Sequence, residues 1–296
     1  MGTWGAAMRF SFIESMCDPV QLAPLARAAE EAGFTTFLVP DSICFPEQAV
    51  GEYPYNEDGS RDFLEDKPFL EPFSLIPALA AATSRLRFTT YVLKLPIRNP
   101  VLVAKSAASV AVLTGNRLGL GVGLSPWVED FQVCGQDWKT RGKRMDEMIE
   151  IVRGLTAGGF FEYRGEHYEL PRIKISPVPS RPIPILIGGH SEAALRRAAR
   201  LGDGFLHAGL DAGEQRDALR RLRALLREHG REREPFEIHA SPLGVTGLDG
   251  FREFEELGVT DCIVGPRNPY EGDTLSLAQK LDFVRGFADQ VIAKLG

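Results

Sequence analysis

Charged and imidazole side chains end three apolar runs of this sequence, in positions that core filling alone does not favour. Asp41 ends the run Phe-Leu-Val-Pro, Glu14 lies near the end of the run Arg-Phe-Ser-Phe-Ile, and His207 follows Gly-Phe-Leu. Carboxylate and imidazole groups in such positions can hold a ligand or transfer a proton. The structural alternative for Asp41 is that it caps a turn. For Glu14 and His207 the alternative is a structural role, with the polar group satisfied by hydrogen bonds within the protein. His239 falls inside a run and is interpreted as structural.

A second candidate site is the sequence Gly-Gly-His-Ser-Glu, which joins an apolar run to an amphipathic one. Two glycines allow a ligand to approach the backbone closely, and the first N–H groups of a helix attract anions. We therefore predict a phosphate-binding segment at Gly188, Gly189 and His190. The alternative is a tight turn in which Ser191 or His190 caps the helix.

Other glycines argue against a nucleotide fold. Gly119, Gly121 and Gly123 have the spacing GxGxG rather than GxGxxG, and they lie inside an apolar run rather than at the start of a helix. Glycine within a strand is typical of close approach by backbone or ligand, so Gly123 and the following Leu124 are candidates for the cofactor-binding face. The sequence has no Walker A, GxSxG, CxxC or HExxH motif, and we expect no metal site.

The elements that must position these residues alternate strictly between strand and helix. Apolar runs predict strands at 9–15, 35–41, 86–93, 117–124, 184–188, 204–208, 236–241 and 261–265. Amphipathic runs predict helices at 19–33, 73–83, 100–113, 141–157, 191–201, 212–229, 250–257 and 275–295. Eight such units favour a closed (β/α)8 TIM barrel over an open sheet, with residues 1–296 forming a single domain.

Two stretches interrupt this alternation. Residues 45–71 form a long loop after strand two, rich in acidic and aromatic residues. It follows the C-terminal end of a strand, where barrels carry their active sites, so we interpret it as a lid. A solvated insertion or an oligomer contact is the alternative. Residues 158–180 predict a hairpin inserted before strand five.

Composition excludes several classes of protein. The chain has 296 residues, a net charge of −6 and four scattered cysteines. This charge makes nucleic acid and anionic membranes poor partners, and no apolar run is long enough to span a bilayer. The cysteine pattern and the absence of a signal peptide predict a cytoplasmic protein. We interpret residues 1–7 as an added segment, with Met8 as the natural start.

Four segments resemble the luciferase-like flavin oxidoreductases, whose barrel binds FMN or the deazaflavin coenzyme F420. They read AEEAGFTTFLVPDS (29–42), LPIRNPVLVAKSAASVAVLTGNRLGLGVG (95–123), RGKRMDEMIEIVRGL (141–155) and PIPILIGGHSEAALRRAARLGDGF (182–205). They occur in the order of the family and are specific for the superfamily, but not for a substrate.

The resemblance implies a ring across the strand ends with its phosphate near Gly188. It also implies a bulge with a non-prolyl cis peptide behind the ring, at Thr90, Tyr91 and Val92. An Asp-His pair often ends strand two in the deazaflavin branch, whereas this chain has Asp41-Ser42.

Some deazaflavin dehydrogenases have an acidic residue shortly after the GVG of strand four. Here Leu124-Ser125-Pro126-Trp127 follows Gly123, with Glu129 and Asp130 further on, which argues against a sugar-phosphate dehydrogenase. Trp127 either walls an apolar substrate pocket or anchors a packed loop.

The resemblance thus favours an F420-dependent oxidoreductase that transfers hydride between the deazaflavin and a small organic substrate. Asp41 would fix the ring, and His207 or Glu14 would donate or accept the proton. One alternative is an FMN-dependent monooxygenase that uses O2 and a separate flavin reductase. Another is a barrel that binds a flavin without turnover. The resemblance also suggests a homodimer.

Overall fold

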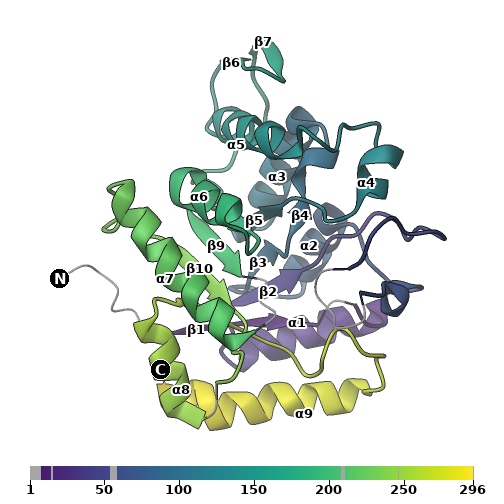
Figure 1. Ribbon diagram of the computed structural model, residues 1–296. Coiled ribbons are helices and arrows are strands. Elements are labelled where there is room, and N and C mark those ends of the chain that lie inside the picture. The colour runs from purple at the N-terminus through teal and green to yellow at the C-terminus, as the bar shows by residue number, and fades with distance from the viewer. Residues whose placement is uncertain (1–7, 15, 54–58, 208–210, 246, 296) are drawn as a thin grey trace.

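The computed structural model describes residues 8–14, 16–53, 59–207, 211–245 and 247–295, so the expected added segment 1–7 lies outside it. Its main sheet is parallel and closes on itself (Figure 1). The sheet contains β1 (Arg9–Ile13), β2 (Thr36–Val39), β3 (Arg87–Thr90), β5 (Leu118–Gly123), β8 (Ile185–Gly188), β9 (Gly204–His207), β10 (Glu237–Ala240) and β11 (Asp261–Val264). β1 pairs with both β2 and β11, and β3 pairs with β5. The predicted TIM barrel is confirmed.

Helices follow the strands and cover the outside of the barrel (Figure 1). They are α1 (Leu22–Glu31), α2 (Pro72–Ala81), α3 (Pro100–Leu113), α5 (Arg141–Thr156), α6 (Glu192–Leu201), α7 (Ala212–Glu228), α8 (Gly247–Glu256) and α9 (Leu277–Phe287). The predicted last helix changes to a π-helix at Ala288–Ile292 before ending as α10 (Ala293–Leu295). None of the helices in the described ranges combines the length and the apolar character needed to cross a membrane.

Side chains alternate between the helix layer and the barrel interior. In β1, Phe10 packs outward on Phe251 of α8 and Phe287 of α9, with ring centroids 5.6 and 5.3 Å apart. Its neighbours Arg9 and Ser11 meet residues of β10 and β11 inside the barrel. The apolar core therefore lies between sheet and helices, while the interior of the barrel carries polar groups at the N-terminal strand ends.

Strand three departs from the predicted single run 86–93. It ends at Thr90 and resumes as β4 (Leu93–Lys94), so two strand pieces share one position beside β5. The peptide bond Tyr91–Val92 between them is cis, as the resemblance implies. The glycines of β5 face this segment: a Cβ at Gly119 would lie 2.6 Å from Thr89 Oγ1. The GxGxG spacing is thus explained by close approach of strand three.

Both interruptions of the barrel are where the sequence places them. Between β2 and α2 the described residues contain only a 3-10 turn, η2 (Asp62–Leu64). The predicted hairpin consists of β6 (Phe161–Arg164) and β7 (Glu169–Ile173), which stands away from the barrel (Figure 1). Further 3-10 turns are η1 (Pro19–Gln21) and η3 (Leu95–Ile97). The sequence reading missed the short helix α4 (Val128–Val133) after β5.

Candidate active site

Tyr91 and Val92 form a support across the C-terminal mouth of the barrel. The Tyr91 hydroxyl donates to the backbone oxygen of His207 at 3.1 Å and so links strand three to β9. Val92 packs over two strands, since a Cβ at Gly123 or at Gly188 would lie 2.6 Å from one of its methyl groups. Both side chains remain partly exposed. They present a small surface at the position where the resemblance places the ring.

Asp41 lies beside this support, but its carboxylate is already engaged. One oxygen accepts from the backbone N–H of Lys94 at 2.8 Å, and the other accepts from Arg98 at 2.9 Å. The Asp41 side chain is only 1% exposed. The carboxylate therefore anchors the segment that follows Tyr91–Val92, and direct contact of Asp41 with a ring remains a prediction.

A second buried ion pair follows β5. Lys94 Nζ lies 2.7 Å from Asp130 Oδ2, and Asp130 is fully buried. Ser125 donates its hydroxyl hydrogen to the same carboxylate oxygen. Because Lys94 and Ser125 engage Asp130, this carboxylate does not replace the acid that some deazaflavin dehydrogenases have after strand four.

Trp127 is a packed anchor and not an open pocket wall. It is 3% exposed and contacts two cations, with Lys94 Nζ at 4.3 Å and Arg61 Cζ at 4.8 Å from the ring centroid. Such contacts stabilise a desolvated aromatic ring. Of the two alternatives for Trp127, the geometry supports the loop anchor.

Arg61 fastens the loop 45–71 to α4. Its guanidinium donates to Glu129 Oε2 at 3.2 Å and to the backbone oxygen of Val50 at 3.0 Å. Partial burial acts to raise the pKa of Glu129, but hydrogen bonds from the Val50 N–H and Arg61 hold it below its usual value. The other edge of the loop meets the β11–α9 segment, where Phe63 and Tyr270 have centroids 5.3 Å apart.

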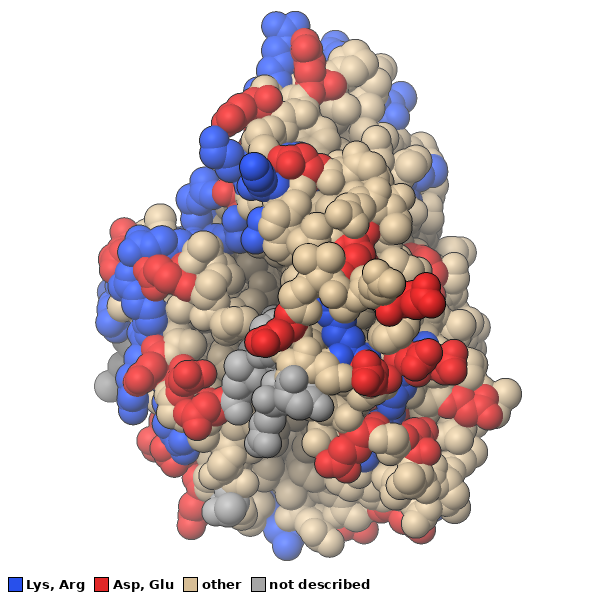
Figure 2. All heavy atoms as spheres, turned by 45° about the vertical axis from the view of Figure 1, so that its right-hand side comes forward, with Lys and Arg blue, Asp and Glu red and all other residues tan. Residues whose placement is uncertain are grey.

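The loop therefore reaches across the C-terminal side of the barrel. Acidic side chains gather on the right of the face drawn in Figure 2, and Lys and Arg gather along its left edge. A cavity of about 620 Å³ lies within the loop and is lined by residues from Phe45 to Glu65. A second cavity of about 510 Å³ lies between the loop, the β1–α1 connection and the β11–α9 segment.

Glu14 belongs to a buried charge cluster beneath that second cavity. Its carboxylate accepts from Arg267 at 2.9 Å and lies 3.8 Å from Lys280 Nζ. Both cations also meet Asp273. Since Arg267 and Lys280 already neutralise Glu14, the geometry does not favour it as a proton donor or acceptor.

The Gly188–His190 segment has the form that its sequence predicts. Ser191 is the N-cap of α6, where its hydroxyl accepts from the Ala194 N–H at 3.3 Å, and Gly189 has φ +139°. The Gly189 N–H donates to the backbone oxygen of Leu206 at 3.3 Å, so this segment lies against the end of β9. The N-cap alternative is observed, and anion binding remains a prediction.

His207 is the titratable group that adjoins this segment. It is 2% exposed, and its Nδ1 lies 3.1 Å from the side-chain nitrogen of Gln215 in α7. Burial, with a smaller contribution from His190, lowers the pKa of His207 to about 4. Sequence reasoning missed Gln215, because a glutamine four residues into an Arg-rich helix carries no signal of a buried partner.

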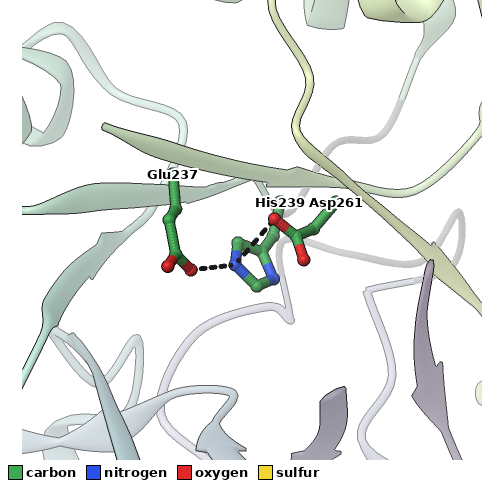
Figure 3. A group of neighbouring side chains, drawn as sticks. All are labelled: Glu237, His239 and Asp261. Carbon is green, nitrogen blue, oxygen red and sulfur yellow. Dashed lines mark hydrogen bonds and ion pairs between the residues drawn. The ribbon is translucent and has the colours of Figure 1, made fainter. Parts of the chain in front are cut away.

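His239 lies at the opposite end of the barrel. Its Nε2 lies 3.1 Å from Glu237 and 3.5 Å from Asp261, as Figure 3 shows. Among the described residues this trio has the spacing of a metal site. However, Arg9 and Arg87 already pair with these two carboxylates. The structural interpretation of His239 fits this arrangement, and the cluster is better described as a salt-bridge network than as a metal centre.

Comparison with known proteins identifies the class. Residues 13–246 match the family model of the luciferase-like monooxygenases, and the chain belongs to this family. An uncharacterized protein of Mycobacterium tuberculosis is 52% identical over 97% of this chain and 100% of its own length. An F420-dependent glucose-6-phosphate dehydrogenase of Amycolatopsis mediterranei is 30% identical over 64% of this chain. The matched part of the chain covers about half, 53%, of the length of that dehydrogenase.

Solved structures share the fold at low sequence identity. The coenzyme F420-dependent tetrahydromethanopterin reductase of Methanopyrus kandleri superimposes with a TM-score of 0.76 at 15% identity, covering 98% of this chain and all of its own. The monooxygenase RslO1 of Streptomyces bottropensis has the same TM-score at 16% identity and the same coverage. The chain is thus an oxidoreductase of the luciferase-like family.

Proposed function

We propose that this protein is a coenzyme F420-dependent oxidoreductase that transfers hydride between the deazaflavin and a small organic substrate. The observation that carries the proposal is the support formed by Tyr91 and Val92 at the barrel mouth. The similarity to an F420-dependent dehydrogenase across 64% of the chain favours the deazaflavin. When bound, the deazaflavin supplies the hydride chemistry, and the protein supplies binding, orientation and electrostatics.

The residues of the mouth fit such a group. Tyr91 and Val92 would lie behind the ring, and Gly123 and Leu124, together with Thr90, would border it. Asp41 would act by holding Lys94 and hence the segment that carries Tyr91 and Val92. Gly188, Gly189 and His190 would border the phosphate, and the first N–H groups of α6 would hold it.

The loop 45–71 would exclude water from the mouth. Arg61 and Trp127 fix it to α4, and Tyr270 meets its other edge. Excluding water strengthens electrostatic interactions between bound groups and the protein. Glu14 is disfavoured as a proton-transfer group, because Arg267 and Lys280 neutralise it within its own ion cluster.

An FMN-dependent monooxygenase is a second candidate, because a solved monooxygenase fits the fold as well as an F420-dependent reductase does. Titration with F420 and with FMN, followed by fluorescence quenching, distinguishes the two. Tight binding of F420 alone, with anaerobic oxidation of its reduced form by a substrate, supports hydride transfer. Preference for FMN, with O2 consumption that requires a flavin reductase, would replace it by the monooxygenase.

We also propose a homodimer. The outer surface of α3 exposes Leu102 by 67% and Leu113 by 73%, whereas α7 turns arginine and acidic side chains outward. Eleven residues, three helical turns, separate Leu102 from Leu113, so both lie on one face of α3, and an exposed apolar face is a candidate for a protein contact. Light scattering should report a dimer for the wild type and a monomer for Leu113→Arg; a monomeric wild type contradicts the proposal.

A further inference from the structure

His207 points away from the barrel interior. Its neighbour Leu206 packs inside the barrel, next to Gly121 of β5. Side chains alternate along a strand, so His207 faces the helix layer, where it meets Gln215 of α7. The imidazole therefore lies at the C-terminal end of β9, under the N-terminal turn of α7. It adjoins the end of β8 because Gly188 pairs with Leu206.

The orientation of the Gln215 amide follows from its second contact. Its nitrogen Nε2 lies 3.0 Å from the backbone oxygen of Ser241 and 3.1 Å from His207 Nδ1. A carbonyl oxygen only accepts hydrogen bonds, so the nitrogen of the amide, not the oxygen, must face Ser241. The same nitrogen donates its other hydrogen to His207 Nδ1. Nδ1 is then an acceptor, and the proton of the neutral ring is on Nε2.

We propose that Gln215 is a positioning residue that keeps His207 in the neutral tautomer protonated on Nε2, and that this N–H binds an anionic group of the cofactor. The tautomer follows from the contacts of Gln215, whereas the identity of the ligand rests on the proposed function. His207 thus serves the anionic end of the cofactor and not proton transfer at the ring.

Two observations place the imidazole beside the predicted phosphate segment. The Gly189 N–H donates to Leu206, the residue before His207, and His190 is close enough to disfavour a charge on the ring. The Nε2 atom has no partner within the part of the chain that the structure describes. The first N–H groups of α6, which follows Gly189 and His190, lie at the same end of the barrel.

The groups around the ring keep it uncharged. They are Gln215 from α7, His190 from the β8–α6 segment, Tyr91, whose hydroxyl donates to the His207 backbone, and Ser241 after β10. None of these four carries a negative charge that would favour an imidazolium. A neutral imidazole can still donate a strong hydrogen bond to an anion. Ligand binding through His207 should therefore be constant between about pH 5.5 and pH 8, because the ring does not titrate there.

Nitrogen-15 NMR of the protein without ligand tests the tautomer. In the wild type we expect a pyridine-like shift at His207 Nδ1 and a pyrrole-like shift at Nε2, unchanged from pH 5.5 to pH 8. Gln215→Glu presents an acceptor to Nδ1, so the proton should move to that nitrogen; Gln215→Leu should give a mixture. His229, exposed at the end of α7, is the internal reference histidine. A protonated Nδ1 in the wild type, or titration of His207 near pH 6.5, overturns the proposal.

The second part of the proposal, that His207 binds an anionic group of the cofactor, is tested with pairs of ligands that differ only in that group. FMN and riboflavin share a ring and differ by a phosphate, and F420 can be compared in the same way with its precursor that lacks the phosphodiester. His207→Leu should weaken the anionic member about tenfold or more and leave the other within about twofold. His207→Gln, which retains a donor, should recover part of the loss, and His229→Leu should change neither.

If His207→Leu loses the same affinity for both members of a pair, His207 does not bind the anionic group, and this part of the proposal is overturned. If the wild type binds none of the four compounds, the proposed function fails and the ligand assignment fails with it. The NMR experiment still decides the tautomer in that case, so the two failures are distinguishable.

Discussion

The two ends of the barrel both bury charge, but they compensate it differently. At the N-terminal end the partners lie on the strands themselves: Arg9 pairs with Asp261 at 2.6 Å, and Arg87 pairs with Glu237 at 2.9 Å. His239 fills the space between the two carboxylates (Figure 3). These residues are held by strand register, and Asp261 and His239 at the centre of the network are fully buried.

At the C-terminal end the compensating cations come from connections between elements. Arg98, after η3, neutralises Asp41, and Arg267, after β11, neutralises Glu14. These ion pairs fix segments around the mouth and leave Tyr91 and Val92 partly exposed. The difference indicates that charge at one end stabilises the barrel, and that charge at the other shapes an opening in which His207 is uncharged.

Removing a carboxylate from the N-terminal network should have the largest effect on stability. Asp261→Ala leaves Arg9 and His239 without their buried partner, which should lower the free energy of unfolding by about 3–5 kcal/mol. Urea denaturation measures the loss, and ligand affinity of the folded protein should stay within about twofold. Asp282→Ala, in an exposed pair with Arg285, is the control and should cost at most about 0.5 kcal/mol. A ligand-binding defect without a loss of stability contradicts the comparison.

The pH dependence of stability should separate the two ends. The pKa of His207 is about 4 in the folded protein and about 6.5 when unfolded. Between these values the unfolded chain binds the extra proton, so stability falls as pH decreases, by up to about 1.4 kcal/mol per unit. The two carboxylates of the network should respond only below about pH 4.5. Burial acts to raise the pKa values of Glu237 and Asp261, but His239 and the arginines hold both below their usual 4.5 and 3.8.

Two variants test which residues cause the loss of stability in each of the two pH ranges. His207→Gln should remove the decrease between pH 6.5 and pH 4 and leave the decrease at lower pH. Asp261→Asn should reduce the low-pH decrease and leave the upper window unchanged. Urea midpoints measured from pH 3 to pH 8 provide the comparison. A wild-type stability that is flat from pH 6.5 to pH 4 would show that the pKa of His207 is not lowered in the folded protein.

Asp41→Ala should affect both stability and binding. The substitution frees the Lys94 N–H and removes the partner of Arg98, at a cost of about 2 kcal/mol. Because Lys94 follows the Tyr91–Val92 support, affinity for the cofactor should also fall, by about tenfold or more. Asp41→Asn keeps an acceptor for the Lys94 N–H and should retain more affinity than Asp41→Ala. Wild-type affinity in Asp41→Ala would remove Asp41 from the site.

The sequence is sufficient to predict the barrel, because its strands and helices alternate and their periodic patterns are local. The pattern also places the hairpin 158–180 and the loop 45–71, whereas the strand-three bulge is expected only from the family resemblance and breaks the predicted strand 86–93. The interaction partners of the site residues cannot be predicted in this way. Nothing near Asp41 in the sequence indicates Arg98, since 57 residues separate them.

The role of His207 shows the same limit. Its position at a strand end suggests chemistry, but only the neighbouring β9–α7 packing reveals Gln215 and the outward direction of the ring. Similarly, the residues near Glu14 in the sequence contain no partner for its carboxylate, which is neutralised by Arg267, 253 positions away. Strand-end position predicts where a site lies; long-range contacts decide which of its groups are available.

Loosening the loop 45–71 should have the smallest effect on the free energy of unfolding. Its measurable effects should be confined to the barrel mouth, in the solvent access of Trp127 and in cofactor affinity. Arg61→Ala removes the bond to Glu129 and the contact with Trp127. The loop can open locally without unfolding the barrel, so the free energy of unfolding should change by less than about 1 kcal/mol. Acrylamide should quench Trp127 more strongly in the variant, measured in a background in which both Trp4 and Trp138 are replaced by Phe, and cofactor affinity should fall. Arg220→Ala, in an exposed pair with Asp217 on α7, is the matched control and should change neither quenching nor affinity. Unchanged quenching in Arg61→Ala would mean that Trp127 is held without the loop, and that this end of the barrel is as rigid as the other.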